Sequence, residues 1–252
     1  MNNIIDVILV LTQKEIKVRY KGSILGYLWS IIHPLLFSLV FFVAFKIFMR
    51  VPIENYTLFL ICALFPWQFF ANSTLVSINS YLANAQIVKK TNFPRFTLPL
   101  SNILMETVHF LISVPVIIAF LYYYNVSPNY LSLITYMPFL LALQVIFTYG
   151  ISLTFSSLNV LFRDTERFIS IGIMLLFYMT PIIYSVDLIP EEYASFIKYN
   201  PMSSFVTSWR DLFITGEIEN KYFVSMLAST IISITVGVIT YQKLKYKFAE
   251  IL

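Results

Sequence analysis

The chain has 252 residues, of which 58% are hydrophobic and only 12% are charged, and its mean hydropathy is +0.77. Soluble domains carry about 25% charged residues, so this composition excludes a water-soluble globule with an ordinary polar surface. The formal net charge of +4 fits a membrane-associated chain and does not indicate nucleic-acid binding. The composition therefore predicts an all-α, polytopic membrane protein.

The N-terminal segment, residues 1–22, is predicted to form an amphipathic helix at the membrane interface. Its apolar run is too short to span a bilayer, and no small-residue cleavage site marks a signal peptide. At helical spacing the apolar side chains share one side and the charged ones the other, which suits a helix lying in the interface. A solvated helix packed on the protein is the alternative. Gly22 and Gly26 then allow a sharp bend.

Six segments are long and apolar enough to cross a bilayer, which takes about 20 mostly apolar residues in a helix. Several of them contain proline, which membrane helices tolerate where neighbouring groups satisfy the freed carbonyls. The predicted spans are residues 26–48, 57–79, 97–123, 131–157, 168–185 and 222–242.

Most of the 17 basic residues lie on one side of this arrangement. They occupy the N-terminal segment, the turns after the second and fourth spans, and the C-terminal tail. Lys and Arg are enriched on the cytoplasmic side of membranes. The sequence therefore predicts a multi-pass protein of the cytoplasmic (inner) membrane, with both termini in the cytoplasm.

A short basic stretch, AQIVKKTNFPR at residues 85–95, follows the second span. It carries Lys89, Lys90 and Arg95 and no acid, between long apolar segments. The predicted orientation puts this stretch in the cytoplasm, where a basic patch contacts either lipid headgroups or a cytoplasmic protein.

Few ionisable side chains fall within the predicted spans. Glu106 and His109 lie three residues apart on the third span and so share one helix face. Ionisable groups inside a bilayer are costly and mark functional positions by default, but a metal site usually needs about three protein ligands. We interpret the pair as structural or passage-lining, with a proton relay or catalysis as alternatives. His33 is expected to bond freed backbone or line a cavity.

Uncharged polar side chains form stripes along two of the spans. Such stripes are costly against lipid, so they either hold helices together or line a passage for a neutral polar solute. Aromatic residues make up 17% of the chain, and the combination favours uncharged or amphiphilic cargo over ions. The stripes consist of Gln68, Asn72 and Asn79 on the second span and Gln144, Thr148 and Ser152 on the fourth.

Residues 187–216 form the longest segment expected on the outer side of the membrane. Pro190 begins a first short helix, Pro201 begins a second, and Gly216 ends it. Both helices are too short to span, so we predict a re-entrant hairpin between the fifth and sixth spans. A pair of helices lying flat on the membrane is the alternative.

Several motifs of enzymes and nucleotide-binding proteins are missing from the sequence. It contains no G-x-x-x-x-G-K-[ST] phosphate loop and no H-E-x-x-H, C-x-x-C or G-x-S-x-G pattern. We therefore expect this chain to bind no ATP through such a loop and to carry no cofactor of its own.

Four stretches resemble, in this order, the permease subunits of type 2 ABC transporters: EIKVRYKGSILGYLWSIIHPLL, IVKKTNFPR, LNVLFRDTERF and YNPMSSFVTSWRDLFI. The resemblance covers nearly the whole chain. It is closest to the branch that exports O-antigen, capsular polysaccharide or teichoic acid on a polyprenyl lipid. It implies one transmembrane domain over residues 1–252, a homodimer, and two separate ATPase subunits that bind ATP and magnesium. The chain would then be a transporter subunit and not an enzyme.

The resemblance further implies that residues 85–95 form a coupling turn seated in a cleft of the ATPase. Apolar and charged side chains of the turn would both contribute to docking, with a second contact from the N-terminal helix. The residues expected to dock are Ile87, Val88, Lys89, Lys90, Phe93, Pro94 and Arg95 of the turn, and Glu15 and Lys17 of the helix.

By the same resemblance, a lipid-linked pyrophosphate would enter at the bend after the interfacial helix. The residues expected at this entrance are Arg19, Tyr20, Lys21, Gly22, Gly26, Tyr27 and Trp29. The two polar stripes, together with His33, Glu106 and His109, would line the passage beyond it. The hairpin would gate the outer side, through Pro190, Pro201, Phe205, Trp209 and Arg210.

Three other functions compete with this reading of the residues. A drug or lipid exporter of the same superfamily often carries a large extracellular domain or a fused ATPase, and we expect neither here. A membrane enzyme acting on polyprenyl phosphate needs clustered carboxylates or a base, for which only Glu106 and His109 are candidates. A proton-coupled flippase would be expected to show an inverted repeat, and the sequence reveals none.

Overall fold

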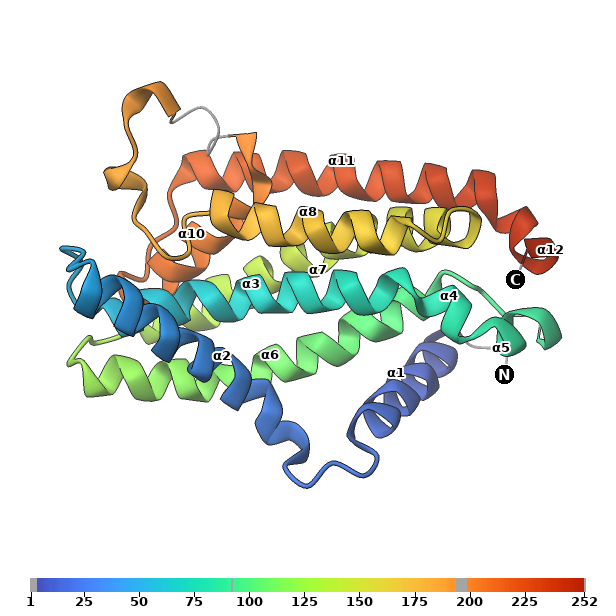
Figure 1. Cartoon of the computed structure of the whole chain (residues 1–252), viewed down its shortest axis with the longest axis horizontal. Helices are drawn as coiled ribbons and strands as arrows, with labels where there is room; N and C mark the ends of the chain where they lie inside the picture. Colours follow the sequence, from blue (N-terminus) through green and yellow to red (C-terminus); the bar gives the residue numbers. More distant parts are fainter. Residues whose placement is uncertain (1–3, 92, 194–198, 252) are drawn as a thin grey trace.

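The computed structural model describes residues 4–91, 93–193 and 199–251, and within them all regular structure is helical (Figure 1). The predicted all-α class is therefore confirmed. Most of the long helices run side by side along the longest axis of the molecule, while α2 crosses them obliquely (Figure 1). The long helices are α2 (Trp29–Phe41), α3 (Tyr56–Ile78), α6 (Thr97–Tyr123), α7 (Tyr130–Leu161), α8 (Thr165–Met179) and α11 (Asn220–Leu244).

Five helical segments among the described residues are long and apolar enough to cross a membrane. They coincide with the predicted first, second, third, fourth and sixth spans: Gly26–Phe48, Tyr56–Ile78, Thr97–Tyr123, Tyr130–Leu161 and Asn220–Lys247. The fifth predicted span, 168–185, is wrong at its end, because α8 stops at Met179 after 15 residues. Thr180 is extended (φ −100°, ψ 138°), as expected for the residue before a proline, here Pro181.

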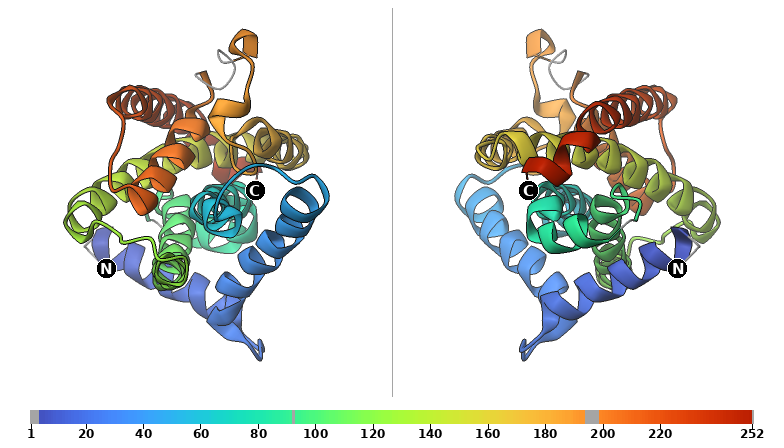
Figure 2. Two further views of the ribbon diagram at one scale, coloured as in Figure 1. Left: turned by 90° about the vertical axis from the view of Figure 1, so that its left-hand side faces the viewer. Right: turned by 90° about the vertical axis from the view of Figure 1, so that its right-hand side faces the viewer.

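Helix α3 lies at the centre of the bundle. It contacts α2, α6, α7 and α8, and also the shorter helix α10 (Pro201–Ile214). End-on views place α2 and α11 on opposite sides of it (Figure 2). Within the most apolar stretch of each segment, 72% of residues are buried for α3 but only 11% for Gly26–Phe48. Apolar residues occupy all sides of α3 and form no single stripe. This is expected for a helix that is surrounded by protein.

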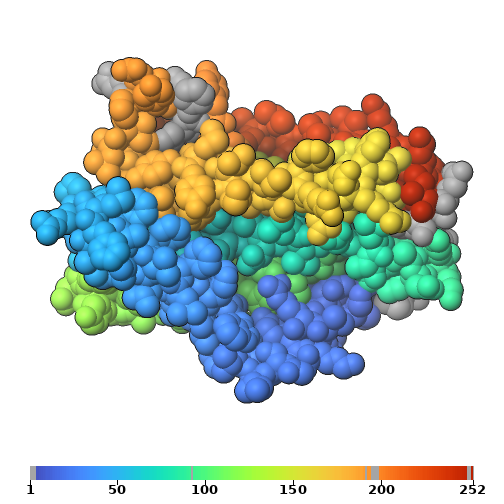
Figure 3. Space-filling model, in the orientation of Figure 1, coloured from blue at the N-terminus to red at the C-terminus, as the bar shows by residue number. Residues whose placement is uncertain are grey.

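The predicted N-terminal helix is present as α1 (Ile4–Tyr20), which packs against α6 at a steep angle to the bundle (Figure 1). Leu11 is buried in this contact, whereas Ile5 is exposed. After α1 the chain turns through Gly22 (φ +77°) and Gly26 (φ +48°), which glycine adopts at little cost. The bend predicted from these glycines is confirmed, and it makes α1 and α2 a V whose apex projects from the surface (Figure 3).

A second, smaller group of buried side chains closes the end of the bundle where both chain termini lie (Figure 1). It joins α1, α6 and α7 to three short helices, α4 (Ser80–Ala83), α5 (Ala85–Lys90) and α12 (Phe248–Ile251). The rings of Tyr81 and Phe248 are 4.7 Å apart within it. The basic stretch 85–95 is thus anchored beside both termini. The buried members are Leu11, Tyr81, Val88, Leu98, Val160 and Phe248.

The predicted outer hairpin is only partly reproduced. Before residues 194–198, which lie outside the described residues, the segment contains only the single turns η3 (Val186–Leu188) and η4 (Glu191–Tyr193). The second predicted helix is present as α10, capped at its start by the side chain of Asn200 and followed by Gly216 at φ +79°. Most of its side chains are buried, and it contacts α3, α7 and α11. Helix α10 is therefore inserted into the bundle and does not lie flat on it.

Helices α7 and α11 pack backbone against backbone at two glycines. A Cβ atom on Gly150 would lie 2.4 Å from the backbone of Ser233, and one on Gly237 would lie 2.5 Å from the carbonyl oxygen of Gly150. Ser233 Oγ also donates a hydrogen bond to the Phe147 carbonyl at 3.1 Å. Small residues of this kind let membrane helices pack backbone against backbone.

This contact predicts that Gly237→Ala destabilises the protein by about 1 to 3 kcal/mol, because the added methyl group overpacks a rigid backbone contact. The matched control is Gly172→Ala on α8, where nothing lies within 4 Å of the new Cβ. Thermal unfolding of the purified chain in detergent measures both variants. Equal melting temperatures for the two variants would contradict the prediction.

Candidate functional site

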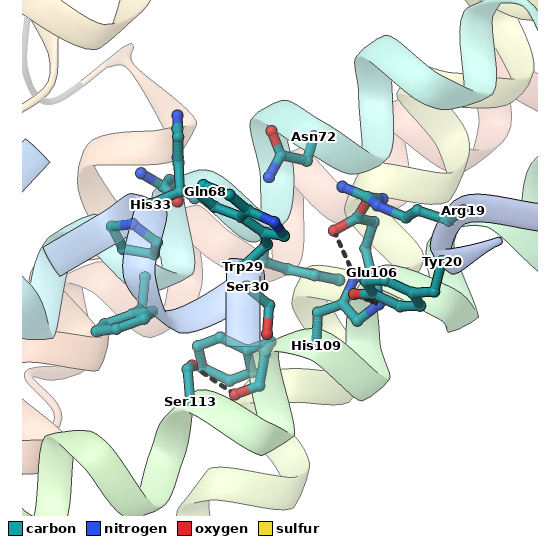
Figure 4. Close-up of a pocket in the computed structure, with 14 residues that line it drawn as sticks. Arg19, Tyr20, Trp29, Ser30, His33, Gln68, Asn72, Glu106, His109 and Ser113 are labelled. Atoms are coloured by element: carbon teal, nitrogen blue, oxygen red, sulfur yellow. Dashed lines mark hydrogen bonds and ion pairs between the residues drawn. The ribbon is translucent and has the colours of Figure 1, made fainter. Parts of the chain in front are cut away.

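Residues predicted for the entrance and for the passage meet at one cavity. It has a volume of about 300 Å³ and lies between the end of α1 and helices α2, α3 and α6 (Figure 4). Ser30 and Ser113 also line it, and the sequence carried no signal for either. The predicted residues brought together there are Arg19, Tyr20, Trp29, His33, Gln68, Asn72, Glu106 and His109.

A chain of polar contacts forms one wall of this cavity. Arg19 Nη1 pairs with Glu106 Oε1, Glu106 Oε2 lies 3.2 Å from His109 Nδ1, and His109 Nε2 lies 2.7 Å from the Tyr20 hydroxyl. Arg19 and Tyr20 are consecutive at the end of α1, and Glu106 and His109 are one turn apart on α6. Arg19 and Tyr20 of α1 thus bind Glu106 and His109 of α6.

The protons in this chain follow from the chemistry of the partners. The Glu106 carboxylate only accepts hydrogen bonds, so His109 Nδ1 carries a proton and donates it. In the neutral imidazole with its proton on Nδ1, Nε2 is the acceptor, so the Tyr20 hydroxyl donates to it. The side chain of Glu106 is 3% exposed and that of Arg19 is 36% exposed. Both side chains line the cavity, but the carboxylate is nearly buried and Arg19 is the more accessible partner.

The opposite side of the cavity is lined by polar side chains and carries no carboxylate. Figure 4 shows His33 and Gln68 across from the Arg19–Glu106 contact, with Trp29 between the two sides. Gln68 and Asn72 have no side-chain hydrogen bond to any described residue. Amide groups both donate and accept, so this side suits hydroxyl or amide groups of a ligand. The cavity can therefore hold an anionic group at one end and a neutral polar group at the other.

Three of the predicted passage residues belong elsewhere, since Gln144, Thr148 and Ser152 are fully buried on α7. Gln144 Nε2 donates to the Pro66 carbonyl at 2.9 Å, and its Oε1 accepts from Trp209 Nε1. Gln144 therefore joins α3, α7 and α10, while the Thr148 and Ser152 hydroxyls are buried without a hydrogen-bond partner among the described residues. In this structure none of the three lines the cavity, which corrects the prediction that they line a passage. Gln144 thus ties α7 to the proline-containing turn of α3.

The remaining entrance and passage residues lie around the cavity but not in its wall. Lys21, Gly22 and Gly26 are in the projecting turn, and the ring of Tyr27 packs against that of Tyr20 in a tilted arrangement, with 4.4 Å between the ring centres. Asn79 ends α3, where its side-chain oxygen accepts from Asn159 Nδ2 at 3.0 Å. Asn79 is thus a helix-end contact and not a lining residue, a second correction to the predicted passage.

The predicted coupling turn divides into exposed and internal side chains. Lys89 and Lys90 are exposed at the end of α5, and both are free to meet a partner. Val88 is 1% exposed, and Phe93 packs against the same buried group. Arg95 Nη1 donates to the Lys245 carbonyl at 2.9 Å. The prediction that Val88 docks on an ATPase is therefore wrong for this structure, because its side chain is buried against other residues of the same chain.

Other predicted docking residues keep part of their surface. Ile87 and Pro94 are half-buried, and Lys17 is exposed. The Glu15 carboxylate accepts from Lys14 Nζ at 2.8 Å. Lys14 Nζ also donates to Asn84 Oδ1, the residue before α5. Helix α1 and the basic turn are thus joined directly.

The predicted outer gate contains a buried arginine that anchors α10. Arg210 donates to the carbonyls of Pro181 at 2.7 Å, Ile182 at 3.0 Å and Phe59 at 3.2 Å, and its guanidinium lies 3.6 Å from the Phe59 ring centre. These bonds satisfy the backbone where α8 ends. Phe205 and Trp209 are also fully buried, whereas Pro190 is exposed. The sequence pointed to Arg210 as a residue of the outer segment, but it did not show which carbonyls accept hydrogen bonds from its guanidinium.

The described residues do not form a metal site. No three His, Cys, Asp or Glu side chains among them lie close enough together to hold an ion. Glu106 and His109 stand with Arg19 and Tyr20, which are not metal ligands in this arrangement.

Comparison with known proteins agrees with this architecture. The family model for the ABC-2 type transporter matches residues 6–214. The chain belongs to the ABC-2 type transporter family. It is therefore a permease subunit, and the predicted membership of the type 2 ABC permeases is confirmed.

Curated relatives of this permease cover nearly its full length. It is 53% identical over 247 residues to the O-antigen export system permease protein RfbA of Klebsiella pneumoniae, covering 98% of this chain and 95% of that protein. It is 28% identical to the protein of the same name from Myxococcus xanthus, over 95% and 93% of the two chains. It is 24% identical to the polysialic acid transport protein KpsM of Escherichia coli, over 91% and 90%.

The anchoring of α10 predicts that Arg210→Met destabilises the permease by about 1 to 3 kcal/mol or more, since it removes the buried donor bonded to the Pro181 and Ile182 carbonyls, which lie outside the helices. Arg167→Met on the exposed side of α8 is the matched control and should change the melting temperature little. Thermal unfolding in detergent distinguishes them. A melting temperature for Arg210→Met equal to that of the control would remove the anchoring role.

Proposed function

We propose that this permease forms the membrane passage of an ATP-driven exporter that moves a lipid-linked polysaccharide of the O-antigen class. The observation that carries the proposal is the 53% identity, over nearly the full length of both chains, to a protein named for O-antigen export. The cavity is consistent with it, because it offers one arginine for an anion and uncharged polar groups for a sugar.

We further propose that the working unit is a homodimer with two ATPase subunits in the inner membrane. Each chain would cross the membrane six times, with α8 as a short fifth span and α10 as a re-entrant element on the outer side. Leu36, Leu39 and Val40 on α2 are exposed in the single chain, which supports contact of this face with lipid or with a second copy. Both termini would then lie in the cytoplasm.

In this proposal Lys89 and Lys90 supply the contact to the ATPase, which itself binds ATP and magnesium. Their exposure at the tip of α5 supports this role, since charge complementarity guides docking on a partner. Val88 and Arg95 would act indirectly, by fixing α5 to α6, α7 and the C-terminal segment. Motion of the ATPase would reach the bundle through this rigid attachment.

Export would begin when a lipid pyrophosphate approaches the projecting turn between α1 and α2. Lys21 is exposed there and Arg19 stands at the cavity mouth, so both attract an anion, and arginine binds phosphate groups in bidentate fashion. The first sugar would then face the amides of Gln68 and Asn72. Movement of α10 would open the outer side, at the cost of the contacts that Trp209 and Arg210 make.

Affinity purification of the tagged permease tests the ATPase contact. Lys89→Glu with Lys90→Glu should reduce the co-purifying ATPase activity about tenfold or more, which corresponds to about 1.4 kcal/mol of lost docking energy. The control carries the same charge change at Lys243 and Lys247, which are exposed on the C-terminal segment.

Full activity in the Lys89/Lys90 variant would assign this turn to lipid headgroups. Absence of any co-purifying ATPase with the wild-type permease, from membranes in which both proteins are expressed, would contradict the proposed function as a whole.

A further inference from the structure

The cavity contains a carboxylate where an anionic ligand is expected, and the proposed function leaves this unexplained. We propose that Glu106 is an internal competitor for Arg19: a phosphate group that enters the cavity takes the guanidinium from Glu106 and thereby loosens α1 from α6. The cavity would then sense its ligand as well as bind it. This inference rests on the proposed function, because it assigns the phosphate of the lipid-linked cargo to the same site.

The geometry of the ion pair permits such an exchange. Glu106 contacts Arg19 through Nη1, and no other side chain among the described residues is seen to bond the guanidinium. A guanidinium has five N–H donors in a planar fork, so donors stay available to an approaching phosphate. Arg19 is also 36% exposed, whereas Glu106 is 3% exposed, so the cation is the more accessible partner and the carboxylate the nearly buried one.

A phosphate and Glu106 cannot both be held well by one guanidinium. Two anions close together repel strongly where water is scarce, and a buried carboxylate without a partner is costly. His109 reduces that cost, because its Nδ1 hydrogen bond to Glu106 at 3.2 Å does not depend on Arg19. The phosphate is the stronger competitor because it presents more charge and binds the guanidinium by two parallel hydrogen bonds.

The consequence of the exchange falls on α1. The polar contacts of its last two residues with Glu106 and His109 tie the end of α1 to α6. Earlier in the same helix, Lys14 donates to Asn84, the residue before α5, and so ties α1 to the start of the basic turn. A helix of 17 residues is a rigid rod about 25 Å long. Release at the Arg19 end would therefore alter the position of α1 beside α5, where the ATPase is proposed to dock.

Binding of a short polyprenyl pyrophosphate to the intact permease–ATPase complex tests the competition. The probe is farnesyl diphosphate, compared with farnesol, in a polyoxyethylene detergent that contains neither phosphate nor sugar. Glu106→Gln should lower the Kd about tenfold, Arg19→Gln should abolish phosphate-dependent binding, and the control Glu54→Gln should match wild type. Glu54 is exposed in the turn before α3, far from the cavity.

The possible outcomes distinguish failure of the Arg19–Glu106 competition from failure of the proposed function. Weaker or unchanged binding by Glu106→Gln, with binding still lost in Arg19→Gln, would overturn the competition and leave the phosphate site intact. Equal binding by Arg19→Gln and wild type would overturn both. Displacement of the probe by phosphatidylglycerol but not by inorganic pyrophosphate would identify a phospholipid headgroup site and also overturn the inference.

A second measurement keeps all the charges of the cavity in place. Spin labels on Lys17→Cys and Leu111→Cys, both exposed positions on α1 and α6, report the distance between these helices, and the native Cys62 is fully buried. Farnesyl diphosphate should shift the distance distribution to longer values, and farnesol should not. A distribution unchanged by the diphosphate at saturating concentration would contradict the release of α1.

Discussion

The pairing of Arg19 with the buried carboxylate of Glu106 is the interaction on which the site depends. A buried carboxylate without a partner is costly, so the pairing with Arg19 favours the position of α1 in which its end lies against α6. That position sets the angle of α1 and places the glycine bend and α2 across from α3. The cavity exists because these four elements meet around one charge pair and leave polar groups facing each other.

A second constraint acts where α10 is inserted among α3, α7 and α11. Its side chains serve the backbone of its neighbours: Arg210 bonds the carbonyls after α8, and Trp209 shares Gln144 with α3. A non-helical chain inside a membrane requires such partners for its free carbonyls. The early end of α8 thus depends on the burial of α10, whose Arg210 bonds the carbonyls that follow α8.

Much of this could be predicted from local patterns, and the failures have physical causes. Hydropathy located five spans, and the i, i+3 spacing of Glu106 and His109 showed that they share a face. Their partner was not predictable, because Arg19 lies 87 residues away and only tertiary packing brings it near. The stripe at Gln144 was ambiguous because polar residues that line a passage and those that join helices have the same spacing. Val88 was misassigned since an apolar residue in a basic turn fits docking and burial equally.

The most direct test of the central claim is a double-mutant cycle on Arg19 and Glu106. Arg19→Gln, Glu106→Gln and the double variant would be compared with wild type by the free energy of unfolding of the purified permease. If the pair joins α1 to the bundle, the two single substitutions are not additive, and the coupling energy is about 1 to 2 kcal/mol. Additivity within about 0.3 kcal/mol would show that the two side chains act independently and would contradict the account.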